Sequence, residues 1–223
     1  MKKYPALIIL ILLILLTSCQ TGKKAEGYSP DEQLLIAAGL RSSIQQAILD
    51  TESELFTKQP LLSDVPEYGA YTSSLPGFRS LMDAYLAEVN SAVRSALVSV
   101  SDYLISYMSQ YTFTDVRKVL ESGYSSVSQI LRDECADEVA GIFAQALKDD
   151  RDKVMNAYDA AFAESEVWRK NLANLALVGQ EILLDPVMPL DEHALAVLAM
   201  EVYFNGLSEN EVRIRARGDA NGK

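Results

Sequence analysis

The chain has 223 residues, with 31 acidic against 20 basic side chains and a formal net charge of −11 at pH 7. This length suits one domain. The acidic balance argues against nucleic acid as a partner, because phosphates demand clustered lysine and arginine. With one histidine and two cysteines, zinc sites of the usual ligand spacing are unavailable, and no cofactor is predicted.

Residues 1–18 have the pattern of a targeting segment. Lys2 and Lys3 precede an uninterrupted apolar run from Ala6 to Leu16. This order of charged and apolar residues is typical of a secretory signal peptide. The run is too short to span a bilayer as a helix, which takes roughly 20 residues.

The segment Leu16-Thr17-Ser18-Cys19 resembles the bacterial lipobox, which implies cleavage before Cys19 and lipidation of this cysteine by a group that carries acyl chains such as palmitate. A plain signal peptide and an uncleaved anchor are the alternatives. Cleavage makes the mature chain still more acidic, so the membrane attachment must come from the acyl chains rather than from a basic patch. Cys135 is then the one free thiol, which excludes an intrachain disulfide.

The expected organisation is a signal peptide at 1–18, a flexible tether at 19–28, one helical domain at 29–217 and a disordered tail at 218–223. The localisation that follows is the bacterial cell envelope, with the domain in the periplasm and its lipid anchor in a membrane. Either membrane remains possible.

The domain begins with Ser29-Pro30-Asp31-Glu32, a capping box that predicts a helix to about Asp50. Prolines and glycines interrupt residues 57–77, which are expected to form a long irregular connection with one helical turn. A loop of this length is either a packed covering or a functional lid.

Apolar and aromatic residues recur at steps of three and four over 78–111, which predicts one long helix. Thr112-Phe113-Thr114-Asp115 predicts the start of a short helix ending at Gly123. Three further helices are expected: 126–148, 149–184 with a break near 164–165, and a last one from Asp191 to about Arg215. No alternating strand pattern occurs. The predicted fold is all-α, an elongated multi-helix bundle with one long central helix.

Tyrosines are the candidate ligand-binding residues, because a tyrosine combines apolar area with a polar tip. One group shares a helical face and the other lies in the proline-rich connection; the alternative is that their rings wedge helices together. The candidates are Tyr68, Tyr71, Tyr103, Tyr107 and Tyr111.

No catalytic residue is predicted. His193 lies in the first turn of a helix, where an exposed histidine does not indicate a catalytic role. Asp149, Asp150 and Asp152 are interleaved with basic residues, which favours a solvated helix junction over a cation site. Glu52 and Glu54 are conceivable glycosidase carboxylates only if the tertiary geometry brings them to one substrate.

Several short segments resemble a bacterial family of helical, often exported domains catalogued as domain of unknown function 4197. The resemblance implies an all-helical domain and brings no catalytic residues. It departs from the family pattern at 57–77 and at Gly206. The segments are Gly39-Leu40-Arg41 with Ile44 and Ala47, Met82-Asp83 with Asn90, Met108-Ser109 with Thr112–Asp115 and Val119-Leu120-Gly123, and the terminal Phe204, Leu207, Glu209, Glu211, Ile214 and Arg215.

The resulting hypothesis is a lipid-anchored envelope protein that acts as a binding or structural module for an envelope protein or an apolar ligand. An envelope hydrolase using carboxylates and a lipid-carrying transport accessory are the alternatives. An exposed apolar groove favours the binding module. Two carboxylates with raised pKa in one cleft favour the hydrolase, and an enclosed apolar cavity favours the lipid carrier.

Overall fold

The computed structural model describes residues 28–57, 60–63, 68–75, 77–176 and 187–221. All regular secondary structure in these ranges is helical, which confirms the all-α prediction. None of the helices in the same ranges is both long enough and apolar enough to cross a membrane. The predicted signal peptide, with Cys19, lies outside the described residues.

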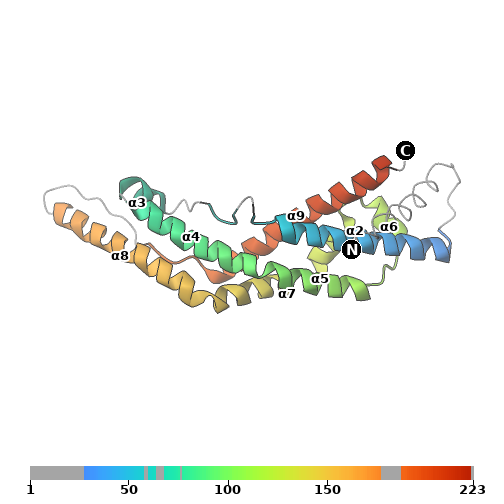
Figure 1. Cartoon of the computed structure of the whole chain (residues 1–223), viewed down its shortest axis with the longest axis horizontal. Coiled ribbons are helices and arrows are strands. Elements are labelled where there is room, and N and C mark those ends of the chain that lie inside the picture. The colour runs from blue at the N-terminus through green and yellow to red at the C-terminus, as the bar shows by residue number, and fades with distance from the viewer. Residues whose placement is uncertain (1–27, 58–59, 64–67, 76, 177–186, 222–223) are drawn as a thin grey trace, which may run out of the picture. The chain divides into compact units, whose positions relative to one another are not determined.

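The described residues form eight helices, and their order along the chain is shown in Figure 1. Their bounds are α2 Pro30–Glu54, α3 Gly69–Ser74, α4 Phe78–Ser95, α5 Leu97–Gln110, α6 Val116–Glu121, α7 Ser126–Asp149, α8 Arg151–Ala176 and α9 Glu192–Asn221.

The start of α2 confirms the predicted capping box. The Ser29 hydroxyl accepts from the Glu32 amide, and the Glu32 carboxylate accepts from the Ser29 amide at 2.8 Å. The Ser29 and Glu32 amides, which have no backbone acceptor inside the helix, are therefore both hydrogen-bonded. Pro30 occupies the first turn, where its missing N–H costs nothing. The Ser29 amide also lowers the pKa of the Glu32 carboxyl, because the hydrogen bond favours its charged form.

The long helix predicted over 78–111 is divided into α4 and α5 at Ala96. The amide of Ala96 bonds the Val93 carbonyl three residues back at 3.2 Å, and the residue keeps right-handed helical angles. The interruption is thus a single turn with a hydrogen bond between residues three apart, and no proline or glycine in the sequence indicates it.

Later boundaries are set by aspartate caps. Asp115 caps α6 by accepting from the Lys118 amide at 3.0 Å, three residues beyond the predicted cap at Thr112. Asp191 caps α9 through the Ala194 amide at 2.9 Å, as predicted. Gly123 has φ +104°, a left-handed angle that suits glycine at the predicted helix end. α8 continues without a break through residues 164–165.

The chain divides into two compact units: unit 1 is Met1–Leu55, Val98–Val139 and Glu201–Lys223, and unit 2 is Phe56–Leu97 and Ala140–Met200. In unit 2, α4 packs along α8 and α3 packs on α4 (Figure 1). The Tyr85 and Tyr158 rings meet edge to face at 5.8 Å between α4 and α8. The predicted domain boundaries remain a prediction.

Unit 1 is held together by buried apolar faces and by polar bonds between helices. α2 packs against α6 and is tied to α9 by the Asn210 amide, which donates to the Thr51 hydroxyl at 2.9 Å. Gly206 of α9 lies where an added Cβ would approach Leu55 Cδ1 at 3.2 Å, so this close approach explains the glycine inside a helix.

Candidate functional site: a tyrosine groove on α5

Three of the five candidate tyrosines line one pocket in unit 1. Residues four apart on a helix share a face, and the rings of Tyr103, Tyr107 and Tyr111 follow one another with centroids 6.4 and 5.9 Å apart. They are half-buried, and the pocket they border has a volume of about 390 Å³. This tyrosine groove is lined by Tyr103, Ser106, Tyr107, Gln110, Tyr111 and Thr112.

A carboxylate from α7 reaches the middle of the tyrosine groove. The Tyr107 hydroxyl donates a hydrogen bond to Glu134 Oε2. This bond, followed by partial burial and the charge of Glu134, raises the pKa of Tyr107. Burial, followed by the charge of the same carboxylate, raises the pKa of Tyr111. The groove therefore combines aromatic faces with a solvent-exposed negative charge.

At the Tyr103 end, the groove packs against Cys135, the one free cysteine among the described residues. Cys135 is fully buried and its thiol contacts the Tyr103 hydroxyl. Desolvation, with the neighbouring thiol and the charge of Glu138, raises the pKa of Tyr103 to about 12. Burial likewise raises the pKa of the Cys135 thiol, so this cysteine is a packing residue and not an activated nucleophile.

The aromatic row continues beyond α5 to an arginine of α2. The Phe113 ring meets Tyr111 edge to face at 5.1 Å, and the Arg41 guanidinium lies 5.8 Å from the Phe113 centroid. Arg41 also donates to the Tyr111 carbonyl at 2.6 Å. A cation is thus already stacked at one end of the row.

Tyr68 and Tyr71, the other two candidates, are placed in unit 2. Both are buried, at 4 % and 3 % exposure. The Tyr68 hydroxyl donates to the Met188 carbonyl, and the Tyr71 ring packs at 5.4 Å from Phe78 and 6.2 Å from Trp168. These contacts describe rings that join helices, so their part in ligand binding remains a prediction without support from an open surface.

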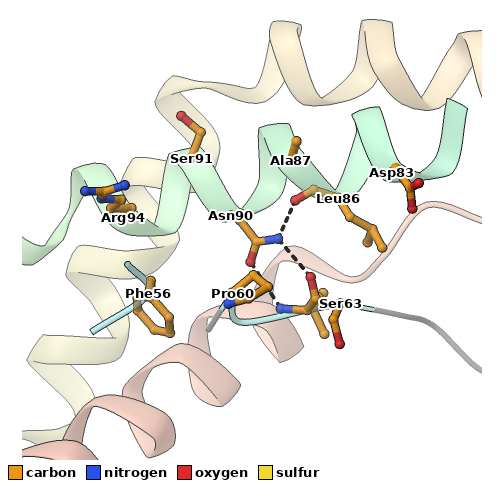
Figure 2. A pocket seen from close by; sticks show the side chains of 10 residues that line it. Phe56, Pro60, Ser63, Asp83, Leu86, Ala87, Asn90, Ser91 and Arg94 are labelled. Carbon is orange, nitrogen blue, oxygen red and sulfur yellow. Dashed lines mark hydrogen bonds between the residues drawn. The ribbon is translucent and has the colours of Figure 1, made fainter. Parts of the chain in front are cut away.

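A second pocket, of about 440 Å³, lies beside α4 in unit 2 and is shown in Figure 2. Its central polar group is Asn90. The Asn90 amide donates to the Leu62 carbonyl at 2.9 Å and the Leu86 carbonyl at 2.7 Å, and its oxygen accepts from the Leu62 amide at 3.1 Å. Both amide protons are already used, so Asn90 clamps the segment 60–63 to α4.

The charged residues of this second pocket cannot act together on a small ligand. Figure 2 shows Asp83 and Arg94 at opposite ends of the exposed stretch of α4. Eleven residues of helix separate them by about 16 Å at 1.5 Å per residue. Because both amide protons of Asn90 are used within the fold and the charges are dispersed, the tyrosine groove is the stronger candidate site.

The acid–base candidates are not brought together. Glu52 and Glu54 are two apart on α2 and so do not share a face. Glu54 instead pairs with Arg213 of α9 at 3.3 Å. His193 is exposed in the first turn of α9. Within the ranges that the structure describes, no cluster of histidine, cysteine and acidic side chains is arranged to hold a metal ion.

The sequence does not reveal the most completely enclosed charged group among the described residues, Glu211 of α9, which is 0 % exposed. Its carboxylate accepts from the Ser128 amide at 2.8 Å, the Ser128 hydroxyl at 2.5 Å and the Val127 amide at 3.3 Å. Arg215 pairs with it at 2.9 Å and donates to the Ser126 hydroxyl at 3.1 Å. The four-residue spacing of Glu211 and Arg215 can be recognised in the sequence, but the burial of Glu211 cannot.

The fold and site define an all-helical domain that offers an aromatic, acid-edged groove and no assembled catalytic group among its described residues. The family model described as "Protein of unknown function (DUF4197)" matches residues 57–223, which is more than half of the chain, and the chain belongs to this family. The match begins after α2, so the resembling residues at 39–47 fall outside it. No curated protein matches the chain. No solved structure matches it either.

Proposed function

We propose that this chain is a lipoprotein of the bacterial cell envelope whose helical domain binds a partner through the tyrosine groove. The geometry of that groove is the observation that carries the binding function. Tyrosines are enriched at interfaces because they supply contact area and a hydrogen-bonding tip at little conformational cost. In this groove the rings are half-buried and lie beside exposed polar side chains.

The lipid anchor is supported by the residues 2–19, in which two lysines, an apolar run and Leu16-Thr17-Ser18-Cys19 follow in order. Acylation of Cys19 would hold the domain at a membrane without any basic surface. This agrees with the strongly acidic composition of the chain, which disfavours electrostatic attachment to anionic lipid.

The anchor is tested by processing and labelling in cells. Globomycin treatment is expected to accumulate a larger precursor, and labelled palmitate is expected to enter the wild-type chain but not the Cys19→Ser variant. The denatured mature chain should then titrate one thiol, that of Cys135, because Cys19 is held as a thioether. Equal mobility with and without globomycin, together with two titratable thiols, would refute the anchor.

The binding function is tested by position-specific crosslinking in intact cells. A photoreactive amino acid at Ser106, which lines the groove, is expected to capture a discrete species. The same amino acid at Lys118, an exposed residue of α6, is the matched control and should not capture it. No adduct at Ser106, or the same adducts at both positions, would reject the groove as the binding surface.

A further inference from the structure

Acidic side chains lie beside the Tyr103 and Tyr107 part of the tyrosine groove, whereas the Arg41 guanidinium lies at its Tyr111 end. None of its six lining residues is basic. Glu134 and Glu138 lie one turn apart on α7, and the charges of these carboxylates act on the groove tyrosines. Asp133 and Asp137 of the same helix are also exposed, which makes this stretch of α7 strongly acidic. A ligand entering the groove therefore meets a negative potential.

The aromatic rings add to this preference. An aromatic face carries partial negative charge and attracts a cation within about 6 Å of its centroid. Successive tyrosine planes are tilted by 36° and 35°, so the rings do not cover one another as parallel stacks. Half-buried rings in this arrangement keep part of their area open to a ligand.

Glu134 retains the capacity to bind a cation. An ionised carboxylate has about four acceptor positions, and the Tyr107 hydroxyl is bonded to one oxygen, Oε2. Within the described part of the chain, no lysine or arginine lies within ion-pair distance of Glu134 or Glu138. Among the described residues, these two carboxylates are therefore without a basic ion-pair partner, and tyrosine hydroxyls are the side-chain groups that bond Glu134.

Arg41 shows where the free part of the aromatic row lies. Its guanidinium is occupied by the Phe113 ring and the Tyr111 carbonyl, at the end of the row away from Tyr103. It provides an internal example of a cation stacked on this row. It also leaves the stretch around Tyr103 and Tyr107, beside the two glutamates, as the part open to a second cation.

We propose that the tyrosine groove receives a lysine or arginine side chain from a basic segment of a partner polypeptide, with the cation placed over the rings of Tyr103 and Tyr107 and paired with Glu134. This inference rests on the proposed binding function and names the chemistry of the partner. The rings supply apolar contact for the aliphatic stem of the basic side chain, and the carboxylate supplies the counter-charge.

The test uses the full chain in detergent and a fluorescent, end-blocked tetralysine peptide, followed by anisotropy. Tetraglutamine and tetraglutamate peptides of the same length are the ligand controls. Saturable binding of tetralysine, weakened by salt and absent for both control peptides, is the expected result. Spermidine is a separate arm, and stronger binding of spermidine than of tetralysine would reassign the groove to a free polyamine and overturn the polypeptide partner.

Matched variants separate binding in the groove from attraction to an acidic surface. Glu134→Gln is expected to weaken tetralysine binding about fivefold, which is the upper range for an exposed ion pair. Asp137→Asn removes the same charge from the same helix and should change the affinity less than twofold. Equal losses in the two variants would overturn the proposal, because they would show attraction without a site.

A second pair of variants tests the aromatic face. Tyr107→Leu keeps an apolar side chain but removes the ring, and should weaken binding about threefold to fivefold. Tyr107→Phe keeps the ring and should bind within twofold of the unaltered chain. Unchanged binding by Tyr107→Leu would reject the stacked cation. Thermal unfolding of each variant in the same detergent checks that the fold is retained.

The two experiments together distinguish a failure of the partner chemistry from a failure of the proposed function. Position-specific capture at Ser106 together with no tetralysine binding would overturn this inference and leave the binding function in place. No capture at Ser106 would reject the binding function. Tetralysine binding that depends on Glu134 and Tyr107 would then describe a groove without a cellular partner and would overturn this inference as well.

Discussion

Two glutamates of unit 1 lie at helix α7, and their surroundings differ: one is buried and the other is exposed. Near the first turn of α7, Glu211 of α9 is wholly enclosed and accepts from two amides, a hydroxyl and the Arg215 guanidinium. Two turns further on, Glu134 of α7 itself is exposed and accepts from the Tyr107 hydroxyl. Both are glutamates that bind a hydroxyl group, but one is saturated and the other retains free acceptor positions.

This difference separates a structural carboxylate from a binding one. Glu211 sits where the amides at the start of α7 lack helical partners, so the charge is stabilised by the helix terminus as well as by Arg215. It has no capacity left for a ligand and its loss would leave buried donors unpaired. Glu134 is exposed, so water competes with protein groups for its charge. For this reason Glu134 contributes little to the stability of the fold and is available to bind a ligand.

The largest expected effect is on stability, from the substitution Glu211→Ala. It leaves the Arg215 charge buried and unpaired and also removes the acceptor from the start of α7. Breaking a buried pair in this way costs about 3–5 kcal/mol of the free energy of unfolding. Urea unfolding of the full chain in detergent, monitored by circular dichroism, measures it.

The control is Glu209→Ala, which removes an exposed carboxylate two residues away on the same helix and should change the free energy of unfolding by no more than about 0.5 kcal/mol. A double variant, Glu211→Leu with Arg215→Leu, should recover part of the loss, because it no longer buries an unpaired charge. It should not recover all of it, since the Ser128 and Val127 amides remain without their acceptor. Similar losses for Glu209→Ala and Glu211→Ala would contradict the structural role.

The sequence predicted the parts of this comparison that depend on one helix. Helical periodicity and caps placed the starts of α2, α7 and α9 close to their observed positions, although α9 continues to Asn221, beyond the predicted end near Arg215. The four-residue spacing placed Tyr103, Tyr107 and Tyr111 on one face. The capping pattern at 112–115 was misplaced by three residues, because Thr112 and Asp115 both have the chemistry of a cap and only the path of the chain selects between them.

The remaining parts depend on contacts between helices, which local patterns do not encode. Glu134 is 27 positions from Tyr107, so its place in the tyrosine groove follows only from the packing of α7 on α5. Glu211 and Arg215 have the spacing of an ordinary surface ion pair. Their burial follows from where the first turn of α7 lies against α9. The division of the long helix at Ala96 has no proline or glycine to signal it.

A smaller effect is expected in the alkaline titration of the groove tyrosines. Tyr103 should ionise near pH 12. The pKa of Tyr107 is also raised, because its hydroxyl donates to the Glu134 carboxylate, is partly buried and lies beside that negative charge. A raised pKa in the folded state stabilises the protein fully below the ordinary tyrosine value of about 10. That stability is lost as the pH rises from there through the raised pKa.

Ultraviolet absorbance of the phenolate in the full chain measures this titration. Glu134→Gln removes the charge beside the ring and should lower the pKa of Tyr107 toward its ordinary value. Asp137→Asn is the matched control and should leave the tyrosine titration curve in place. An identical curve for the unaltered chain and for Glu134→Gln would show that Glu134 does not set the potential of the groove.

The smallest expected effect is on stability, from Tyr107→Phe. It deletes the hydroxyl that bonds Glu134 and keeps the ring contacts with Tyr103 and Tyr111. Because the carboxylate is exposed and can bond water instead, the free energy of unfolding should change by less than about 1 kcal/mol. Urea unfolding under the conditions used for Glu211→Ala makes the two values directly comparable. A loss as large as that of Glu211→Ala would mean that the tyrosine groove is a structural joint like the Glu211 junction, and the distinction between a saturated and an available carboxylate would fail.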